Sequence, residues 1–213
     1  MKTESKITEA ARKRYDRIAP VYDLMEGMVE RSRYSRWREL LWSKVEGNKI
    51  LEVGVGTGKN FPYYPSHTEI TAIDFSKKML SRAQEKAEKQ GITVKLQQMD
   101  VQNLTFEDNT FDTVMATFVF CSVPDPVKGL KEIGRVCKPG GKVLLLEHVL
   151  SANRTLAFLM NLVNPIVVRA MGPNINRKTV GNVANSGLKV EKVTDLAVGI
   201  FKLIEARKEK QTF

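Results

Sequence analysis

The fold is decided by the stretch Leu51-Glu52-Val53-Gly54-Val55-Gly56-Thr57-Gly58. It contains most of a short apolar run, Lys49–Val53, which has the length of a buried strand and leads directly into glycines. Such glycines let the chain turn tightly and let a ligand approach the bare backbone. The loop lacks the complete dinucleotide fingerprint Gly-x-Gly-x-x-Gly, so by itself it indicates a nucleotide-like ligand and nothing more specific.

Strand and helix signals alternate along the chain after this loop. The sequence predicts strands at 49–53, 68–73, 94–98, 111–118 and 142–148, with helices at 77–90 and about 126–136. Ser76 suits the N-cap of the first helix, and Gly91 suits its C-terminal end. Strands that alternate with helices of this length imply parallel βαβ units.

The end of the chain breaks this alternation. Two β-like runs at 188–194 and 201–207 are joined by a short link, so they must pair as an antiparallel hairpin. We therefore predict an α/β fold, a doubly wound, seven-stranded, mostly parallel sheet that ends in a C-terminal antiparallel hairpin. The whole chain, 1–213, is expected to form one domain, with a helical lid (1–46), a core (47–150), a substrate cap (151–187) and the hairpin (188–213).

Length and composition agree with one soluble-type domain. A chain of 213 residues fits a single domain. It has no apolar run of about 18 residues, and its N-terminus lacks the apolar centre of a secretory signal. Two cysteines are too few for a disulfide framework. We expect a cytoplasmic protein.

The net charge of +10 lies entirely outside the predicted core. Residues 1–50 have a net charge of +4, residues 51–150 a net charge of zero, and residues 151–213 a net charge of +6. Basic flanks favour anionic partners such as lipid headgroups or nucleic acid, although a basic protein without such a partner is the alternative.

The segment 153–185 contains the interrupted apolar run TLAFLMNLVNPIVVRAM. Pro165 is expected to prevent one continuous helix here. The run is either a buried cap over the active site or an amphipathic element that lies on a membrane and makes the chain peripheral to it.

Acidic residues stand at two further predicted strand ends. Asp74 follows Gly58 by 16 residues and can accept hydrogen bonds from both hydroxyls of a ribose. Asp100 can accept from an adenine amino group while Val101 packs on the ring. Each has a simpler alternative, since Asp74 can cap a helix and Asp100 can begin a turn. Together they predict a nucleoside site at the switch point between the first and fourth strands.

These motifs, with Phe111-Asp112 and the segment 135–141, resemble the successive motifs of class I S-adenosylmethionine-dependent methyltransferases. The segment 15–23 (YDRIAPVYD) is similar to the ubiquinone/menaquinone-biosynthesis group of that family. The segments 58–65 and 172–179 look similar to phospholipid N-methyltransferases and to membrane-associated thiol methyltransferases.

The resemblance implies S-adenosyl-L-methionine as the cofactor, and no metal site is expected. It implies glycine contacts with the methionine part, and two tyrosines closing the site from the N-terminal helices. The implied cofactor contacts are Tyr15, Tyr22, Glu52, Gly54, Gly56, Thr57, Gly58, Asp74, Phe75, Met79, Asp100, Val101, Thr117 and Phe118.

Candidates for a catalytic group are few. His148, at the end of the fifth predicted strand, has a suitable pKa for a general base, although a histidine there can be purely structural. Tyr22 can orient an acceptor or serve only as a lid.

The acceptor is expected to be a lipophilic small molecule, such as phosphatidylethanolamine or an apolar thiol. Carbon methylation of a quinol precursor is the alternative within enzymes. A nucleic-acid-binding protein with a vestigial site is the alternative from another class, but the sequence lacks the aromatic stacking platform of such proteins, so no nucleic acid is expected. The sequence does not specify an oligomeric state.

Overall fold

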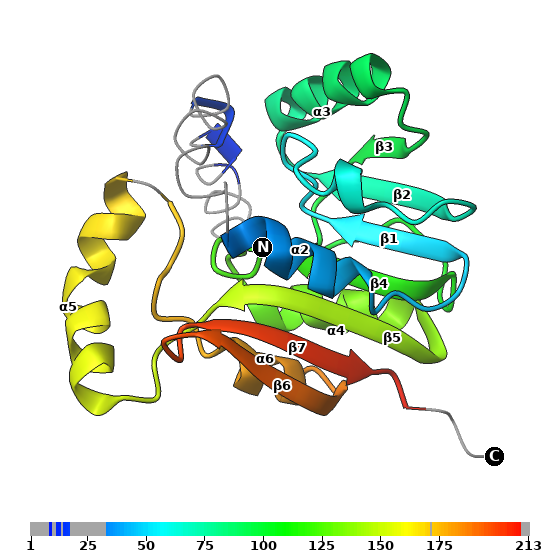
Figure 1. Cartoon of the computed structure of the whole chain (residues 1–213). Helices are drawn as coiled ribbons and strands as arrows, with labels where there is room; N and C mark the ends of the chain where they lie inside the picture. The colour runs from blue at the N-terminus through cyan, green and yellow to red at the C-terminus, as the bar shows by residue number, and fades with distance from the viewer. Residues whose placement is uncertain (1–8, 10–11, 14, 18–32, 171, 210–213) are drawn as a thin grey trace.

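The computed structural model describes residues 9, 12–13, 15–17, 33–170 and 172–209. Tyr22 and most of the predicted lid lie outside these residues. The elements are α2 (Ser35–Trp42), β1 (Lys49–Val53), η2 (Phe61–Tyr63), β2 (Glu69–Asp74), α3 (Lys77–Gln90), β3 (Lys95–Gln98), β4 (Phe111–Thr117), α4 (Pro126–Val136), β5 (Cys137–His148), α5 (Arg154–Ala170), α6 (Thr179–Asn185), β6 (Lys189–Ala197) and β7 (Phe201–Arg207) (Figure 1).

The seven strands form one sheet in the order β3-β2-β1-β4-β5-β7-β6. The first five in that order pair in parallel, and β7 pairs antiparallel with both β5 and β6. The predicted fold class is therefore confirmed. Because β1 lies between β2 and β4, the chain winds in opposite directions from β1, which creates the switch point where α/β proteins bind ligands.

Helices cover both faces of the sheet. One face packs against α2 and α3 through apolar residues such as Leu41, Ile50 and Ala83, and the other packs against α4 and α6 through residues such as Leu130 and Val183. Figure 1 shows α2 in front of the sheet, with α4 and α6 behind it. Both faces being buried explains why the central strands read as continuous apolar runs.

The predicted ends of α3 are confirmed. The Ser76 hydroxyl accepts a hydrogen bond from the Met79 N–H at 3.1 Å, and Gly91 takes a left-handed φ of 64° at the C-terminal end. This cap fixes the start of α3 immediately after Asp74, so the end of β2 and the beginning of the helix are held together.

The fifth strand begins earlier than predicted. Residues 138–141 (KPGG) were expected to separate α4 from the strand, but β5 runs from Cys137. Cys137 pairs with Phe111, and an irregularity in the register then absorbs the extra residues before Lys142 pairs with Thr113. The proline and glycines therefore occupy a distorted strand start, where such residues are tolerated.

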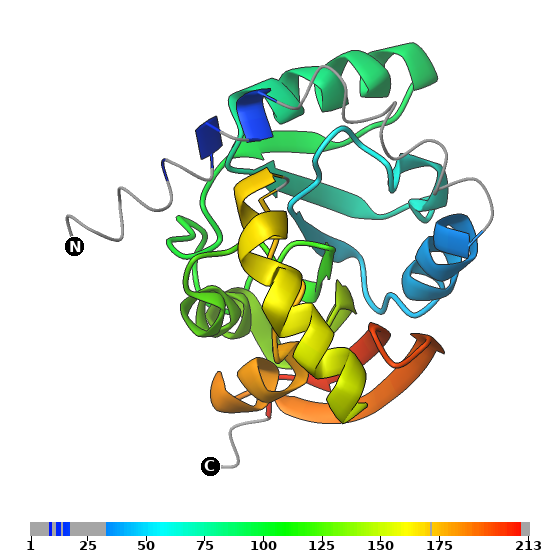
Figure 2. The ribbon, with the colours of Figure 1, turned by 90° about the vertical axis from the view of Figure 1, so that its left-hand side faces the viewer.

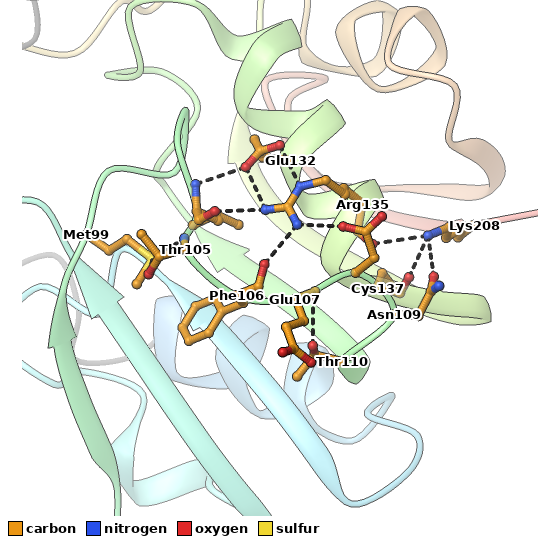
Figure 3. Close-up of polar contacts among 12 residues, drawn as sticks. Met99, Thr105, Phe106, Glu107, Asn109, Thr110, Glu132, Arg135, Cys137 and Lys208 are labelled. Atoms are coloured by element: carbon orange, nitrogen blue, oxygen red, sulfur yellow. Dashed lines mark hydrogen bonds and ion pairs between the residues drawn. The ribbon is translucent and has the colours of Figure 1, made fainter.

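Arg135 ties the turn before β4 to α4 (Figure 3). Its guanidinium donates to the carbonyl oxygens of Leu104 and Phe106, both at 2.8 Å, and pairs with Glu132 at 2.8 Å. Lys208 reaches the same region and donates to the Arg135 carbonyl oxygen at 3.1 Å. The Arg135 guanidinium, which has N–H donors on all three of its nitrogens, thereby holds the loop that follows β3 against α4.

The expectation that Pro165 interrupts a helix is wrong. The helix α5 is continuous from Arg154 to Ala170 with Pro165 inside it. Pro165 lacks an N–H, so it leaves the Asn161 carbonyl without its helical donor. Both residues are exposed, so water can satisfy that carbonyl. Much of the apolar surface of α5 is also exposed, so the helix is not a buried cap.

Candidate functional site

The glycine loop after β1 brings bare backbone to the switch point. Gly54 has a φ of +71°, and a Cβ there would lie 2.3 Å from a methyl group of Val119. Gly56 has a φ of +55°, and a Cβ there would meet no atom within 4 Å. Gly54 is therefore required for packing, whereas Gly56 leaves open space of the kind that a ligand can fill.

Asp74 lies at the end of β2 and braces this loop. Its carboxylate accepts hydrogen bonds from the N–H of Gly56 at 2.9 Å and from the N–H of Ser76 at 2.8 Å. Burial raises the pKa of Asp74 to about 6, partly offset by these N–H donors. The carboxylate lines a cavity at the carboxyl ends of β1, β2 and β4. There its remaining lone pairs can accept hydrogen bonds from ligand hydroxyls.

This cavity of about 710 Å³, partly open to solvent, lies at the carboxyl ends of β1, β2 and β4. Ten of the predicted cofactor contacts line it, namely Tyr15, Gly54, Gly56, Asp74, Phe75, Met79, Asp100, Val101, Thr117 and Phe118. Eight further residues line it that were not predicted as contacts, namely Val53, Ile73, Met99, Gln102, Val119, Ser122, Val123 and Pro124.

Asp100 and Val101 lie on the side of the cavity formed after β3. The Gln102 backbone N–H and side-chain amide both donate to Asp100, at 2.9 Å and 3.0 Å. The Gln102 amide oxygen accepts from the N–H of Asp125 at 2.9 Å. The Asp100 carboxylate is therefore fixed in orientation beside the apolar side chain of Val101, which suits an aromatic ring that carries an amino group.

Tyr15 spans the mouth of the cavity. Its hydroxyl is hydrogen-bonded to the Ser122 hydroxyl at 2.5 Å, and its ring meets the ring of Phe75 with centroids 5.6 Å apart. Tyr15 thereby connects Phe75, which follows β2, with Ser122, which lies in the loop after β4. The structure thus places Tyr15 where a residue closing over the cofactor is expected, and its binding role stays a prediction.

Phe118 is the first residue after β4, and its backbone has a left-handed conformation with a φ of 57°. Its N–H donates to the Leu146 carbonyl oxygen at 2.8 Å, and its ring lies 5.3 Å from Tyr34 and 6.1 Å from Phe201. A non-glycine residue in this conformation is uncommon and is held by its surroundings. The strained backbone of Phe118 therefore lies at the cavity, at the end of β4.

Three predicted contacts lie outside the cavity: Glu52, Thr57 and Gly58. Glu52 is buried under the glycine loop, where it accepts hydrogen bonds from the Asn60 amide at 2.6 Å and from the Tyr64 hydroxyl. Burial raises the pKa of Glu52, and these donors oppose that rise. In this structure Glu52 supports the loop from beneath.

Glu147 was missed as a site residue. Its side chain is fully buried, and one oxygen accepts hydrogen bonds from the N–H groups of Val119 and Phe120 at 2.9 Å and 3.0 Å. Its other oxygen has no hydrogen-bond partner among the described residues. Glu147 thereby fixes the loop that lines the cavity after β4. The available signal was a lone acidic residue inside the apolar run KVLLLEHV.

His148 ends β5 beside an aromatic cluster. Its ring lies 5.2 Å from the ring of Phe201, edge to face, and Nδ1 has no hydrogen-bond partner among the described residues. Burial lowers the pKa of His148, which favours the neutral imidazole at pH 7. His148 is not among the residues that line the cavity, and its ring contacts Phe201, whose ring in turn contacts Phe118.

The cavity fits S-adenosylmethionine. A buried carboxylate at the end of β2 suits a ribose, the Asp100–Val101 corner suits an adenine, and the open backbone at Gly56 suits the methionine part. A mostly parallel sheet with one reversed interior strand and such a site at its switch point define the class of Rossmann-like methyltransferases.

Comparison with known proteins supports this class. Residues 51–145 match the family model described as a methyltransferase domain. A phosphatidylethanolamine N-methyltransferase of Cereibacter sphaeroides is 42% identical over 142 residues, which cover 66% of this chain and 68% of the relative. The ubiquinone/menaquinone biosynthesis C-methyltransferase UbiE of Bdellovibrio bacteriovorus is 34% identical over 153 residues, which cover 69% of this chain and 65% of the relative, slightly less than two thirds.

Solved structures share the fold. An S-adenosylmethionine-dependent methyltransferase of Thermotoga maritima aligns with a TM-score of 0.72 at 19% identity, covering 93% of this chain and 100% of the other. The 42% identity to the Cereibacter relative, over 68% of that protein, shows that the chain belongs to the family of S-adenosylmethionine-dependent methyltransferases. In the described part of the chain, every helix is too short or too polar to cross a membrane.

Proposed function

We propose that this enzyme transfers a methyl group from S-adenosylmethionine to the amine of a phospholipid such as phosphatidylethanolamine. The observation that carries the proposal is the similarity to the Cereibacter phosphatidylethanolamine N-methyltransferase, which extends over 68% of that protein. An apolar thiol is a second lipophilic acceptor of the kind that the sequence suggests. The basic flanks are consistent with a protein that reaches a membrane surface, because they favour anionic lipid headgroups.

The reaction places specific demands on the chain. S-adenosylmethionine supplies a methyl group on a positively charged sulfur. The protein must hold the acceptor nitrogen about 3 Å from that methyl and exclude water. Asp74, Asp100 and Val101 orient the donor, while the loop fixed by Glu147 shapes the wall beyond it. As the new C–N bond forms, the C–S bond breaks, and the nitrogen must already have lost a proton.

Carbon methylation of a quinol is the second candidate function. It is favoured by the 34% identity to the Bdellovibrio relative, which is named as a C-methyltransferase of ubiquinone/menaquinone biosynthesis. The donor site described above does not distinguish the two, because the cavity residues that suit the nucleoside are needed for both.

Incubation with labelled S-adenosylmethionine separates these candidates. We expect label to enter phosphatidylethanolamine in mixed vesicles, and not demethylmenaquinol or an apolar thiol tested in parallel. The Asp74→Ala variant is a low-activity control at subsaturating donor, because we expect it to bind S-adenosylmethionine more weakly. Label in the quinol alone would favour the second candidate, and label only in water-soluble metabolites would exclude a lipophilic acceptor.

His148 is proposed as the base that takes the ammonium proton. Replacement by Gln keeps a planar polar side chain next to Phe201 but removes the base, so kcat is expected to fall by about 10²–10⁴-fold. Because burial lowers the pKa of His148, activity should decline as the pH falls through a value below the usual 6.5, and the variant should lose this limb.

The control for His148 is donor affinity. Calorimetric titration should give the same dissociation constant for S-adenosylmethionine in the wild type and in His148→Gln, because His148 does not line the cavity. An unchanged kcat and pH profile in the variant would show that His148 is structural.

A further inference from the structure

The helix α5 carries apolar side chains on the outside of the molecule. Phe158, Leu159, Leu162, Val163 and Ile166 are between 41% and 70% exposed. Their spacing places them on one side of the helix. Figure 2 shows α5 running across the face of the molecule, outside the rest of the fold. We call these five side chains the outer stripe of α5. An apolar patch of this kind marks an interaction surface.

The opposite side of α5 is fastened to the rim of the donor cavity. The Asn164 amide oxygen accepts a hydrogen bond from the N–H of Ile175 at 2.9 Å. The neighbouring Asn174 donates both its backbone N–H and its side-chain amide to the Cys121 carbonyl oxygen, at 2.9 Å and 3.2 Å. Cys121 lies in the loop after β4, and Ser122 beside it lines the cavity. The outer stripe is therefore held at a fixed position relative to the cavity.

The charged residues in the segment that carries the outer stripe are all positive. Arg154 and Arg169 stand near the two ends of α5, and both are exposed. Between Glu147 and Glu191 the sequence has five Lys or Arg and no Asp or Glu. Two copies of this face would bring like charges together, which disfavours self-association. An anionic lipid surface offers both an apolar layer for the stripe and opposite charge for the arginines.

We propose that the outer stripe of α5 inserts into the headgroup region of an anionic bilayer and holds the donor cavity at the membrane surface. This inference rests on the proposed function only for its purpose, which is to bring a lipid acceptor to the cavity. The binding itself depends on apolar area and on cationic charge, and it requires neither donor nor acceptor.

Vesicle co-sedimentation of the full chain tests the inference. The vesicles contain equal parts of phosphatidylcholine and phosphatidylglycerol, with pure phosphatidylcholine for comparison, and no donor is added. Because no ethanolamine lipid is present, the result does not depend on which acceptor the enzyme uses. We expect the wild type to bind the mixed vesicles and to bind the uncharged vesicles much more weakly.

Variants locate the contact. Leu162→Asp with Ile166→Asp is expected to lower the partition coefficient by about a hundredfold or more, because each apolar side chain that is buried in the bilayer raises that coefficient roughly tenfold. Leu40→Asp is the matched control, since Leu40 is an exposed leucine on α2. It should bind like the wild type. Arg154→Gln with Arg169→Gln should weaken binding to the mixed vesicles only, and it provides a variant that leaves the apolar stripe intact.

Two results would overturn the inference. Equal vesicle binding by the Leu162→Asp/Ile166→Asp variant and the wild type, with both showing cooperative thermal unfolding, would place the membrane contact elsewhere. A wild-type dimer in sedimentation velocity that the same variant abolishes would assign the outer stripe to a second copy of the chain.

Discussion

The Asp74→Ala variant is expected to bind S-adenosylmethionine about 5- to 150-fold more weakly than the wild type. The expected loss is about 1–3 kcal/mol, the usual cost when polar groups are left without partners. The Asp74 carboxylate also accepts a hydrogen bond from the Gly56 N–H at 2.9 Å. Its removal is therefore expected to loosen the glycine loop and to abolish the ribose contact. Calorimetric titration of the donor measures the change.

The control for Asp74 lies on the same strand. Glu69 is the first residue of β2, at the end of the strand opposite Asp74, and it is exposed. Glu69→Ala should therefore leave the dissociation constant for S-adenosylmethionine unchanged. An unchanged affinity in Asp74→Ala would contradict the ribose role. Because burial raises the pKa of Asp74 to about 6, donor affinity should also fall as the pH is lowered through that value in the wild type, and should not do so in Asp74→Asn.

The Glu147→Gln variant is expected to change the pH dependence of stability. Burial raises the pKa of Glu147 from 4.5 to about 7 in the folded protein. A raised folded pKa stabilises the protein below the unfolded pKa, and this contribution is lost as the pH rises toward 7. The loss amounts to about 3 kcal/mol, since one pKa unit corresponds to about 1.4 kcal/mol. Gln keeps an acceptor for the N–H groups of Val119 and Phe120 and does not ionise.

Urea unfolding at pH 5 and at pH 8 measures this effect. The free energy of unfolding of Glu147→Gln minus that of the wild type should increase by about 2–3 kcal/mol between the two pH values. His148 titrates in the same range in both proteins, so taking the difference reduces its contribution. Glu69→Gln, at an exposed position, should show no such increase. Parallel pH profiles for Glu147→Gln and the wild type would contradict the buried, shifted carboxyl.

Local signals made most of the fold predictable. Ser76 and Gly91 marked the ends of α3 because a cap and a left-handed glycine depend on only a few neighbouring residues. The hairpin of β6 and β7 was predictable because two adjacent strands with a short link can pair only one way. Asp74 and Asp100 were predictable as cavity residues because strand ends of a parallel sheet meet at one edge.

The remaining features could not be predicted, because they depend on contacts between residues far apart in the sequence or on exposure in the folded protein. Whether Glu52 faces the cavity or lies beneath the loop depends on Asn60 and Tyr64, which approach it only after folding. The role of Glu147 depends on the loop after β4, which lies 27 to 28 residues away in sequence. Pro165 was misjudged because the freed carbonyl costs little on an exposed helix surface, and its exposure is not written in the local sequence.

The order of the strands has a consequence for biosynthesis. The strand β7 is the last of the seven to leave the ribosome, yet it lies inside the sheet, between β5 and β6. Until it emerges, the edge of β5 exposes unpaired backbone groups of the apolar segment 143–146, which is the kind of edge that attracts other strands. Nascent chains of this protein therefore remain open to misassociation until Arg207 has left the ribosome.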